Sequence, residues 1–214
     1  MEIQIDQLRY SYPRKVTPVF DGFSFHANSG ITLIKGFSGC GKSTLLRLIA
    51  GYLKPKKGVI KTTSRYKVGS SMFLAKEVGF VFQQMNLLPL ASLRRNIALS
   101  ALHSTNKETS AYIKRLGLDG LENKKPTELS GGQMQRGAIA RALAKTPSIL
   151  LLDGPTSGLD DLNTKVICET LKELLPKDAV CLIATHDSRL NFIADEILDF
   201  NRHLPLEKHL ESLV

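Results

Sequence analysis

A glycine-rich run at residues 36–44 constrains the fold of this chain more than any other part of its sequence. The run reads Gly-Phe-Ser-Gly-Cys-Gly-Lys-Ser-Thr and matches the pattern G-x-x-x-x-G-K-[ST]. A short apolar strand precedes it at residues 31–34, and leucines with helical spacing follow it at residues 42–50. In that setting, backbone N–H groups and the positive end of the helix dipole converge, which favours a phosphate-binding loop over an ordinary turn.

The loop needs partners that complete a nucleotide site. Lys42 is expected to reach the β- and γ-phosphates, and the Ser43 hydroxyl is expected to ligate Mg²⁺. A second metal ligand is expected at the end of a neighbouring strand, and residues 148–153 form an apolar run that ends in Asp153. The sequence therefore predicts ATP and Mg²⁺ as ligands, with the Cys40 thiol beside the nucleotide. The loop residues expected to bind nucleotide are Gly36, Phe37, Ser38, Gly39, Cys40, Gly41, Lys42, Ser43 and Thr44.

Strand and helix patterns alternate along much of the sequence, which predicts an α/β fold with a mostly parallel sheet. Alternating apolar residues indicate further strands near the N-terminus and at residues 19–27. Between about residues 84 and 129 the pattern turns helical, so we expect an inserted helical subdomain there. In the last third, the pattern predicts helix 133–145, strand 149–153, helix 161–175 and strand 179–184.

Composition narrows the class of protein. A chain of 214 residues, 43% hydrophobic and 23% charged, is expected to form one compact domain. No apolar run approaches the roughly 18 residues of a membrane span, and the acidic, alternating N-terminus is not typical of a secretion signal. The three cysteines have unrelated spacings and no CxxC pair, which favours reduced thiols in the cytoplasm.

The net charge of +9 is concentrated partly in residues 54–67, which contain lysines and arginine but no acidic residue. A solvated basic hairpin near the phosphate-binding site is the favoured interpretation. Because aromatic residues do not alternate with these cations, as single-strand binding would require, we expect no nucleic-acid partner.

A second glycine-rich turn, which we call the signature segment, begins another helix at residues 129–133 and reads Leu-Ser-Gly-Gly-Gln. Its helix N-terminus is another anion-binding device. With this segment, the chain resembles the ATPases of ABC transporters over nearly its whole length. The resemblance implies a P-loop NTPase core (residues 1–83 and 131–214) with an N-terminal antiparallel β subdomain. It also implies a helical subdomain (84–130) that carries the start of the signature segment, all within the single domain 1–214.

The same resemblance implies that the protein works as a dimer. Ser130, Gly131, Gly132 and Gln133 of one subunit would close over the ATP held by the other. The partner would be a second copy or a different ABC ATPase, and both would bind an integral membrane permease. The protein would therefore be cytoplasmic and peripheral on the inner face of the membrane.

Four further positions match the family pattern in order. Gln83 matches a glutamine that senses Mg²⁺ and the attacking water, and Asp160 lies in a loop that crosses the dimer interface. His186 matches a histidine that contacts the γ-phosphate, and Tyr12 lies where an aromatic ring stacks on adenine. The residues 79–83, Gly-Phe-Val-Phe-Gln, followed by Asn-Leu-Leu-Pro at 86–89, resemble the small ATPases of lipoprotein-releasing, macrolide-export and cell-division permease complexes.

Gly154 departs from the family pattern. The family has a glutamate there that polarises the attacking water, and losing a general base typically costs about 10²–10⁴ in rate. Three explanations for the glycine remain open. The site could be the degenerate one of a heterodimer, the protein could be a slow ATPase, or the glycine could be an introduced change. Two functions follow: an ATPase that powers transport, with weak intrinsic activity, or a slow nucleotide switch that regulates a membrane or cell-division complex. Relatives that act on ribosomes or DNA carry tandem cassettes or coiled-coil insertions, which this chain lacks.

Overall fold

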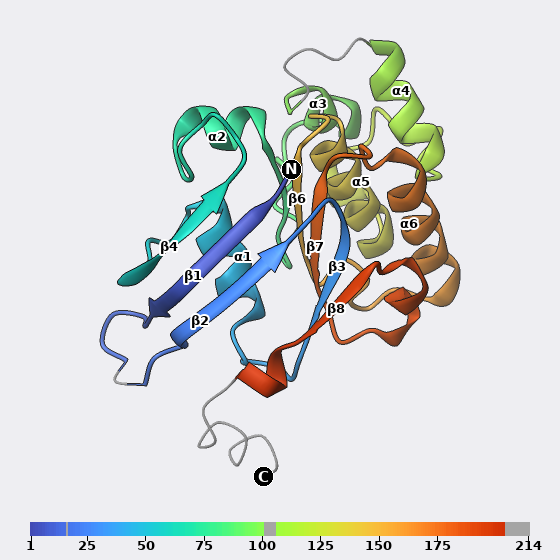
Figure 1. The fold of residues 1–214 in the computed structure, drawn as a ribbon. Coiled ribbons are helices and arrows are strands. Elements are labelled where there is room, and N and C mark those ends of the chain that lie inside the picture. Colours follow the sequence, from blue (N-terminus) through green and yellow to red (C-terminus); the bar gives the residue numbers. More distant parts are fainter. Residues whose placement is uncertain (16, 101–105, 204–214) are drawn as a thin grey trace.

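The computed structural model describes residues 1–15, 17–100 and 106–203, and two sheets organise it (Figure 1). The larger sheet has five strands in the order β5-β6-β7-β3-β8, and each neighbouring pair is parallel. Parallel strands need crossover connections, which the intervening helices supply. The predicted α/β fold with a mostly parallel sheet is confirmed. The strands are β3 (Gly30–Lys35), β5 (Val78–Val81), β6 (Ile149–Asp153), β7 (Val180–Ala184) and β8 (Glu196–Asp199).

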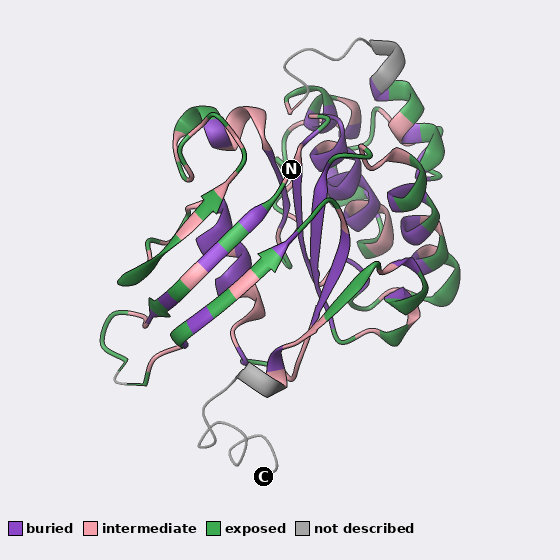
Figure 2. Ribbon diagram, in the orientation of Figure 1, coloured by how far each residue is buried: buried purple, intermediate pink, exposed green. Residues whose placement is uncertain are grey.

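The central strands separate two hydrophobic clusters. Because successive side chains of a strand point to opposite faces, Leu150 and Leu152 of β6 enter one cluster. Ile149 and Leu151 of the same strand enter the other. Figure 2 shows β6 and β7 buried along their whole length, which explains why their sequences are continuous apolar runs.

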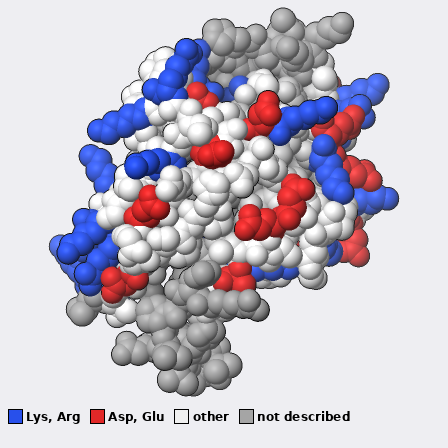
Figure 3. Space-filling model, viewed as in Figure 1, with Lys and Arg blue, Asp and Glu red and all other residues white. Residues whose placement is uncertain are grey.

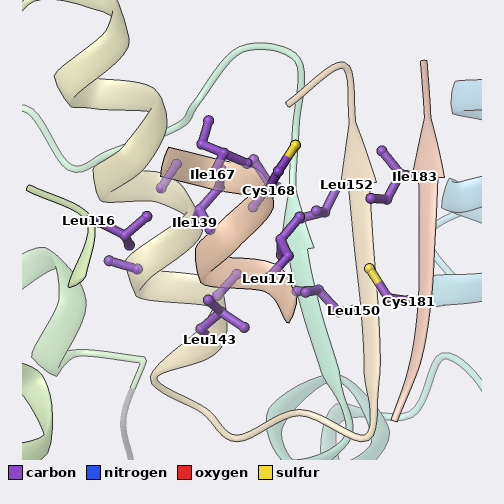
Figure 4. Packing of buried hydrophobic residues seen from close by; sticks show 14 of the residues in the cluster. Leu116, Ile139, Leu143, Leu150, Leu152, Ile167, Cys168, Leu171, Cys181 and Ile183 are labelled. Atoms are coloured by element: carbon purple, nitrogen blue, oxygen red, sulfur yellow. The ribbon is translucent and has the colours of Figure 1, made fainter. Parts of the chain in front are cut away.

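Helices α5 (Gly131–Leu143) and α6 (Asp161–Leu174) cover one face of the large sheet. Ile139 of α5 and Leu171 of α6 lie against Leu150 and Leu152 in the first cluster (Figure 4). Both helices begin on a side-chain cap: Ser130 accepts a hydrogen bond from the N–H of Gln133, and Asp160 accepts one from the N–H of Asn163. The first turn of α5 therefore lies at residues 131–133, slightly before the predicted start.

The opposite face carries α1 (Lys42–Ala50) and the smaller sheet, whose order is β2-β1-β4. Both pairs in this sheet are antiparallel, so the predicted N-terminal antiparallel β subdomain is confirmed. Its strands are β1 (Ile3–Tyr10), β2 (Phe20–Ala27) and β4 (Lys57–Thr62).

The basic stretch of residues 54–67 differs from the hairpin we expected. Residues 57–62 form the edge strand β4, which pairs with β1 and not with a neighbouring segment of its own. Lys57 and Lys61 on this strand are exposed. In Figure 3, Lys and Arg side chains gather along the margin where β4 lies in Figure 1. Charged side chains on an edge strand discourage pairing with another chain.

Three short elements between residues 84 and 130 confirm the helical pattern predicted there, within the described residues. They are α3 (Leu93–Ala98), α4 (Asn106–Arg115) and the 3-10 turn η1 (Pro126–Glu128). Both α-helices contact α5, and they lie away from the β2-β1-β4 sheet (Figure 1). Within the described part of the chain, no helix is long and apolar enough to span a membrane. The remaining elements are α2 (Ser71–Lys76), η2 (Ser188–Ile193) and η3 (Phe200–His203).

Candidate nucleotide site

The candidate site lies where β3, β6 and β7 end. These strands are neighbours in the large sheet, with Ile34 opposite Ala184 and Ala184 opposite Asp153. Because the strands are parallel, their carboxyl ends share one edge, which is where ligands bind in open α/β sheets. The segments that follow the three strands therefore meet, although the sequence separates them widely.

The phosphate loop lies between β3 and α1, as predicted. Gly41 is the N-cap of α1 and has φ 111°, a conformation that favours glycine. The Lys42 Nζ donates hydrogen bonds of 2.8 Å to the carbonyls of Gly36 and Phe37. The ammonium group is thus held within the loop, at the start of the helix that follows.

Ser43 and Asp153 form a direct pair at the loop. The Ser43 hydroxyl donates a 2.8 Å hydrogen bond to Asp153 Oδ1. Burial raises the pKa of the Asp153 carboxyl, while the Ser43 hydrogen bond and the nearby charges of Arg47 and Lys42 oppose that rise. A buried carboxylate of this kind favours a cation beside it, because positive charge offsets the cost of desolvation.

A cavity of about 380 Å³ opens over this pair. Most of the predicted loop residues line it, as do Tyr12, Gln83 and His186. Among the described residues, Asp153 is the only carboxylate that lines the cavity. The lining residues are Tyr12, Ser38, Gly39, Gly41, Lys42, Ser43, Thr44, Gln83, Asp153, Gly154, Ser157, Ala184, Thr185 and His186.

Tyr12 reaches the cavity from the segment after β1. Its hydroxyl lies 3.0 Å from Thr44 Oγ1, and its ring meets Tyr10 edge-on with ring centroids 5.2 Å apart. The ring is half-buried and tethered to the first turn of α1. The contacts with Thr44 and Tyr10 therefore position the side chain at the cavity.

Gly154 follows Asp153 in a left-handed conformation with φ 61°. Its N–H donates to the Ala184 carbonyl at 2.9 Å, and its own carbonyl accepts from the Ser157 N–H at 3.2 Å. A Cβ at this position would lie 2.9 Å from Ser157 Oγ. The chain thus turns sharply at the strand end, and any side chain at residue 154 would be strained there.

Cys40 lies on the inner side of the phosphate loop. Its thiol is fully buried in the second hydrophobic cluster and does not line the cavity. A Cβ added at Gly36 would lie 2.8 Å from the Cys40 sulfur, so the thiol packs under the loop. The Lys42 Nζ also donates to the Cys40 sulfur at 3.6 Å. The thiol thus lies next to the lysine of the loop but on its inner side, and the expectation that it lies beside the nucleotide stays a prediction. Gly36 and Phe37 likewise stay outside the lining.

The signature segment and Asp160 lie apart from the cavity within one chain. Ser130 and Gln133 exchange hydrogen bonds of 2.9 and 3.3 Å between side chain and backbone, which fixes the start of α5. A Cβ at Gly132 would lie 3.3 Å from Leu159 Cδ2, so this turn packs beside the segment that leads to Asp160. The hydrogen bond from the Asn163 N–H lowers the pKa of Asp160.

Three lining residues were missing from the predicted set: Ser157, Ala184 and Thr185. Thr185 directly precedes His186, and Ser157 lies three residues after Gly154, so nearness in the sequence to these two predicted positions was the available signal. These residues line the cavity because the ends of β6 and β7 lie side by side. A local sequence pattern does not predict which strand ends are neighbours.

Comparison with known proteins decides the family. The sequence profile of the ABC transporter family matches residues 20–157 of this chain. The chain belongs to the ABC transporter family. It is 36% identical over 188 residues to the lipoprotein-releasing system ATP-binding protein LolD of Hydrogenovibrio crunogenus, covering 81% of each chain. It is 33% identical over 184 residues to an uncharacterized ABC transporter ATP-binding protein of Mycobacterium tuberculosis, covering 81% of this chain but only 56% of that relative.

Solved cassettes share its architecture. The dimeric ABC transporter cassette MJ0796, in a post-hydrolysis state bound to ADP and phosphate, superposes with a TM-score of 0.81. That match has 28% identity and covers 92% of this chain and 94% of the other. CbiO1 of Clostridium perfringens, part of the transporter complex cbiONQ, has a TM-score of 0.76 and 30% identity, with 92% and 84% covered. The fold places this chain among the ABC cassettes.

Proposed function

We propose that this cassette binds MgATP in the cavity, dimerises around it, and powers or gates a membrane permease. The observation that carries the proposal is the contact of Ser43 with Asp153 beside Lys42, at the mouth of a phosphate loop. A hydroxyl and a carboxylate next to a lysine are the groups that hold the phosphates and metal of ATP in P-loop proteins.

The donor set fits Mg²⁺ when a nucleotide is bound. Ser43 and Asp153 supply hard oxygen donors, which Mg²⁺ prefers. Among the described residues, no group of three or more His, Cys, Asp and Glu side chains gathers into a metal site. The metal would therefore take its remaining ligands from phosphate oxygens and water, with Gln83 at the cavity edge as a further candidate. Bound there, Mg²⁺ would offset the negative charge of the phosphates.

The chain's own residues have distinct roles in this proposal. The loop from Gly36 to Thr44 binds the phosphates through backbone N–H groups. When ATP binds, Lys42 donates its hydrogen bonds to phosphate oxygens in place of the loop carbonyls. Tyr12 packs on the adenine, and His186 contacts the γ-phosphate. The signature residues complete the site of the partner subunit, joined by Asp160 in the loop beside them. Their separation from the cavity within one chain supports a dimer.

Hydrolysis in this site is expected to be slow. Gly154 has no side chain to orient water. Asp153 is the only carboxylate that the described residues place in the lining, and it is hydrogen-bonded to Ser43. A site without a general base is expected to hydrolyse ATP about 10²–10⁴ times more slowly than a site that has one. His186 and Gln83 remain to position water. The ATP-bound dimer would therefore be long-lived.

A second function, a slow nucleotide switch that regulates a membrane complex, is favoured by Gly154 alone. In either case, residues 84–130 would form the helical subdomain, and residues 1–83 with 131–214 the nucleotide-binding core. The likeness to LolD supports a permease as the partner, with the cassette peripheral on the cytoplasmic face. The second subunit would be another copy or a different ABC ATPase.

Light scattering with and without MgATP tests the dimer. The purified protein should dimerise in MgATP and return to monomer when ADP replaces it. ATP turnover with and without a co-purified permease then separates the two functions. Turnover stimulated by the permease supports a transport ATPase, and unchanged slow turnover supports the switch. A protein that neither binds MgATP nor dimerises would refute the proposal.

A further inference from the structure

The loop after β6 lies against the segment after β7. Residues 154–161 lead from β6 into α6, and residues 185–189 lead from β7 into η2. Each carries a residue that lines the nucleotide cavity, Ser157 in the first and His186 in the second. The same two residues also line a neighbouring polar hollow of about 300 Å³. The relative position of these two segments therefore sets the arrangement of side chains at the cavity.

Arg189 joins the two segments with one guanidinium. Its Nε lies 3.0 Å from Asp187 Oδ1, and its Nη2 lies 2.8 Å from Asp187 Oδ2, both within its own segment. The same Nη2 donates to the Leu159 carbonyl at 3.1 Å, and Nη1 donates to Asp161 Oδ1 at 2.6 Å, both in the opposite loop. The planar guanidinium presents its N–H donors in a rigid fork, so it can bind the two carboxylates and the carbonyl at the same time. The ammonium group of a lysine lacks this fork geometry.

Asp187 extends the same network to the start of the loop. The Thr156 hydroxyl donates a 2.7 Å hydrogen bond to Asp187 Oδ2, and the Asp187 N–H donates to Thr185 Oγ1 at 2.9 Å. Hydrogen bonds from Arg189, together with the one from Thr156, lower the pKa of Asp187 to about 2. The Asp187 side chain is 14% exposed, whereas the Asp161 side chain is 93% exposed. The bonds of Asp187 and Leu159 thus contribute more than the surface ion pair with Asp161.

We propose that Arg189 is a positioning residue that holds the loop 154–161 and the segment 185–189 as one unit. It acts through Asp187 and the Leu159 carbonyl, and it fixes Ser157 relative to His186 at the cavity. The inference rests on the proposed function for its consequence: the arrangement it fixes is the one that closes on ATP in the dimer. Because residue 154 offers no carboxylate, the alignment of these neighbouring groups matters more here.

Three variants test the role. Arg189→Ala removes the fork, and Arg189→Lys keeps the charge but not the geometry. Lys165→Ala is the matched control, because it removes one cation from the exposed surface of α6, where Lys165 Nζ lies 3.8 Å from Glu169 Oε1. Hydrogen exchange of the nucleotide-free monomer reports on the two segments separately. MgATP titration of the monomer and light scattering at several protein concentrations separate nucleotide binding from closure.

In Arg189→Ala, we expect exchange to become at least about tenfold faster in both segments, while the phosphate loop stays protected. MgATP affinity should stay within about twofold, whereas dimerisation in MgATP should require about tenfold more protein. Arg189→Lys should show most of both changes, and Lys165→Ala none.

Faster exchange confined to residues 185–189 would overturn the inference, because the opposite loop would then be held without Arg189. Equal losses of nucleotide affinity and dimerisation would also overturn it, since they indicate general destabilisation. Exchange is measured without nucleotide, so it tests the link between the segments even if the wild type binds no ATP. Absence of MgATP binding by the wild type would refute the proposed function instead.

Discussion

Ser43 Oγ lies 2.8 Å from Asp153 Oδ1, although 110 residues separate the two in the sequence. The pair places a hydroxyl and a buried carboxylate at the mouth of the phosphate loop. Both oxygens suit Mg²⁺, and the burial of Asp153 makes the approach of a cation favourable. The metal dependence of nucleotide binding should therefore be lost when either oxygen is removed.

Asp153→Asn tests this pair through thermal stability. MgATP at about a thousandfold excess over its dissociation constant should stabilise the wild type by about 4 kcal/mol. ATP with a chelator should stabilise it less. In Asp153→Asn the two shifts should become equal, because the amide does not replace the carboxylate as a ligand. A variant that keeps the full difference between the two conditions would contradict the assignment of Asp153.

Lys42→Ala tests phosphate binding itself. Without nucleotide, Lys42 is bonded to the carbonyls of Gly36 and Phe37, so its loss also loosens the loop. We expect the MgATP-dependent shift in melting temperature to disappear. The exposed Lys61 on β4 offers a control, since Lys61→Ala removes the same charge far from the loop. Equal shifts in both variants would count against the phosphate-loop role.

A glutamate introduced at Gly154 tests whether a carboxylate at this position increases turnover, with glutamine as the control. Any side chain there should cost about 1–2 kcal/mol, because φ is 61°. The Cβ would also approach Ser157 Oγ, so Gly154→Glu is best combined with Ser157→Ala. Turnover in that double variant should exceed that of Gly154→Gln with Ser157→Ala by about 10²–10⁴.

Glutamine carries the same strain and size without a base, so the two double variants should have similar melting temperatures. His186→Ala should then abolish the gained activity, because the proposed contact of His186 with the γ-phosphate would be lost. Brisk turnover by the wild type, with no gain from glutamate, would show that another group serves as the base.

The cysteines should react slowly in the folded protein. Cys40, Cys168 and Cys181 are all buried, and burial raises the pKa of the Cys168 and Cys181 thiols. A bulky maleimide should therefore leave native MgATP binding intact, and label all three only after unfolding. If the folded protein is labelled rapidly at Cys40, as mass spectrometry would detect, the thiol does not point into the core.

Asp187 should make stability depend on pH in acid. Its pKa falls from 3.8 in the reference state to about 2 in the fold, so the unfolded chain binds the proton more readily. The carboxylate thus contributes stability above pH 3.8, and that contribution is lost as pH falls toward 2. Urea unfolding at a series of pH values should show a shallower acid decline in Asp187→Asn than in the wild type. Parallel declines would contradict the role of this carboxylate.

Local sequence patterns predicted many of the strands and helices. The strand at residues 149–153 lies where its apolar run predicted it, because strands buried on both faces need continuous hydrophobic side chains. The helix α6 begins at Asp161, as expected, since Asp160 supplies its cap. The basic hairpin expected around residues 54–67 did not predict that β4 pairs with β1, because that partner lies some fifty residues earlier in the sequence.

The sequence by itself determined the phosphate loop, the strand that ends in Asp153 and the alternation of strands with helices. Each of these depends on neighbours within a few residues, such as glycines, caps and periodic apolar side chains. Only the tertiary structure decided that the Cys40 thiol points into the core, that Gly154 turns left-handed beside Ser157, and that Arg189 reaches the Leu159 carbonyl. These depend on how separate strand ends meet, because the direction of a side chain is set by the packing of elements remote in the sequence.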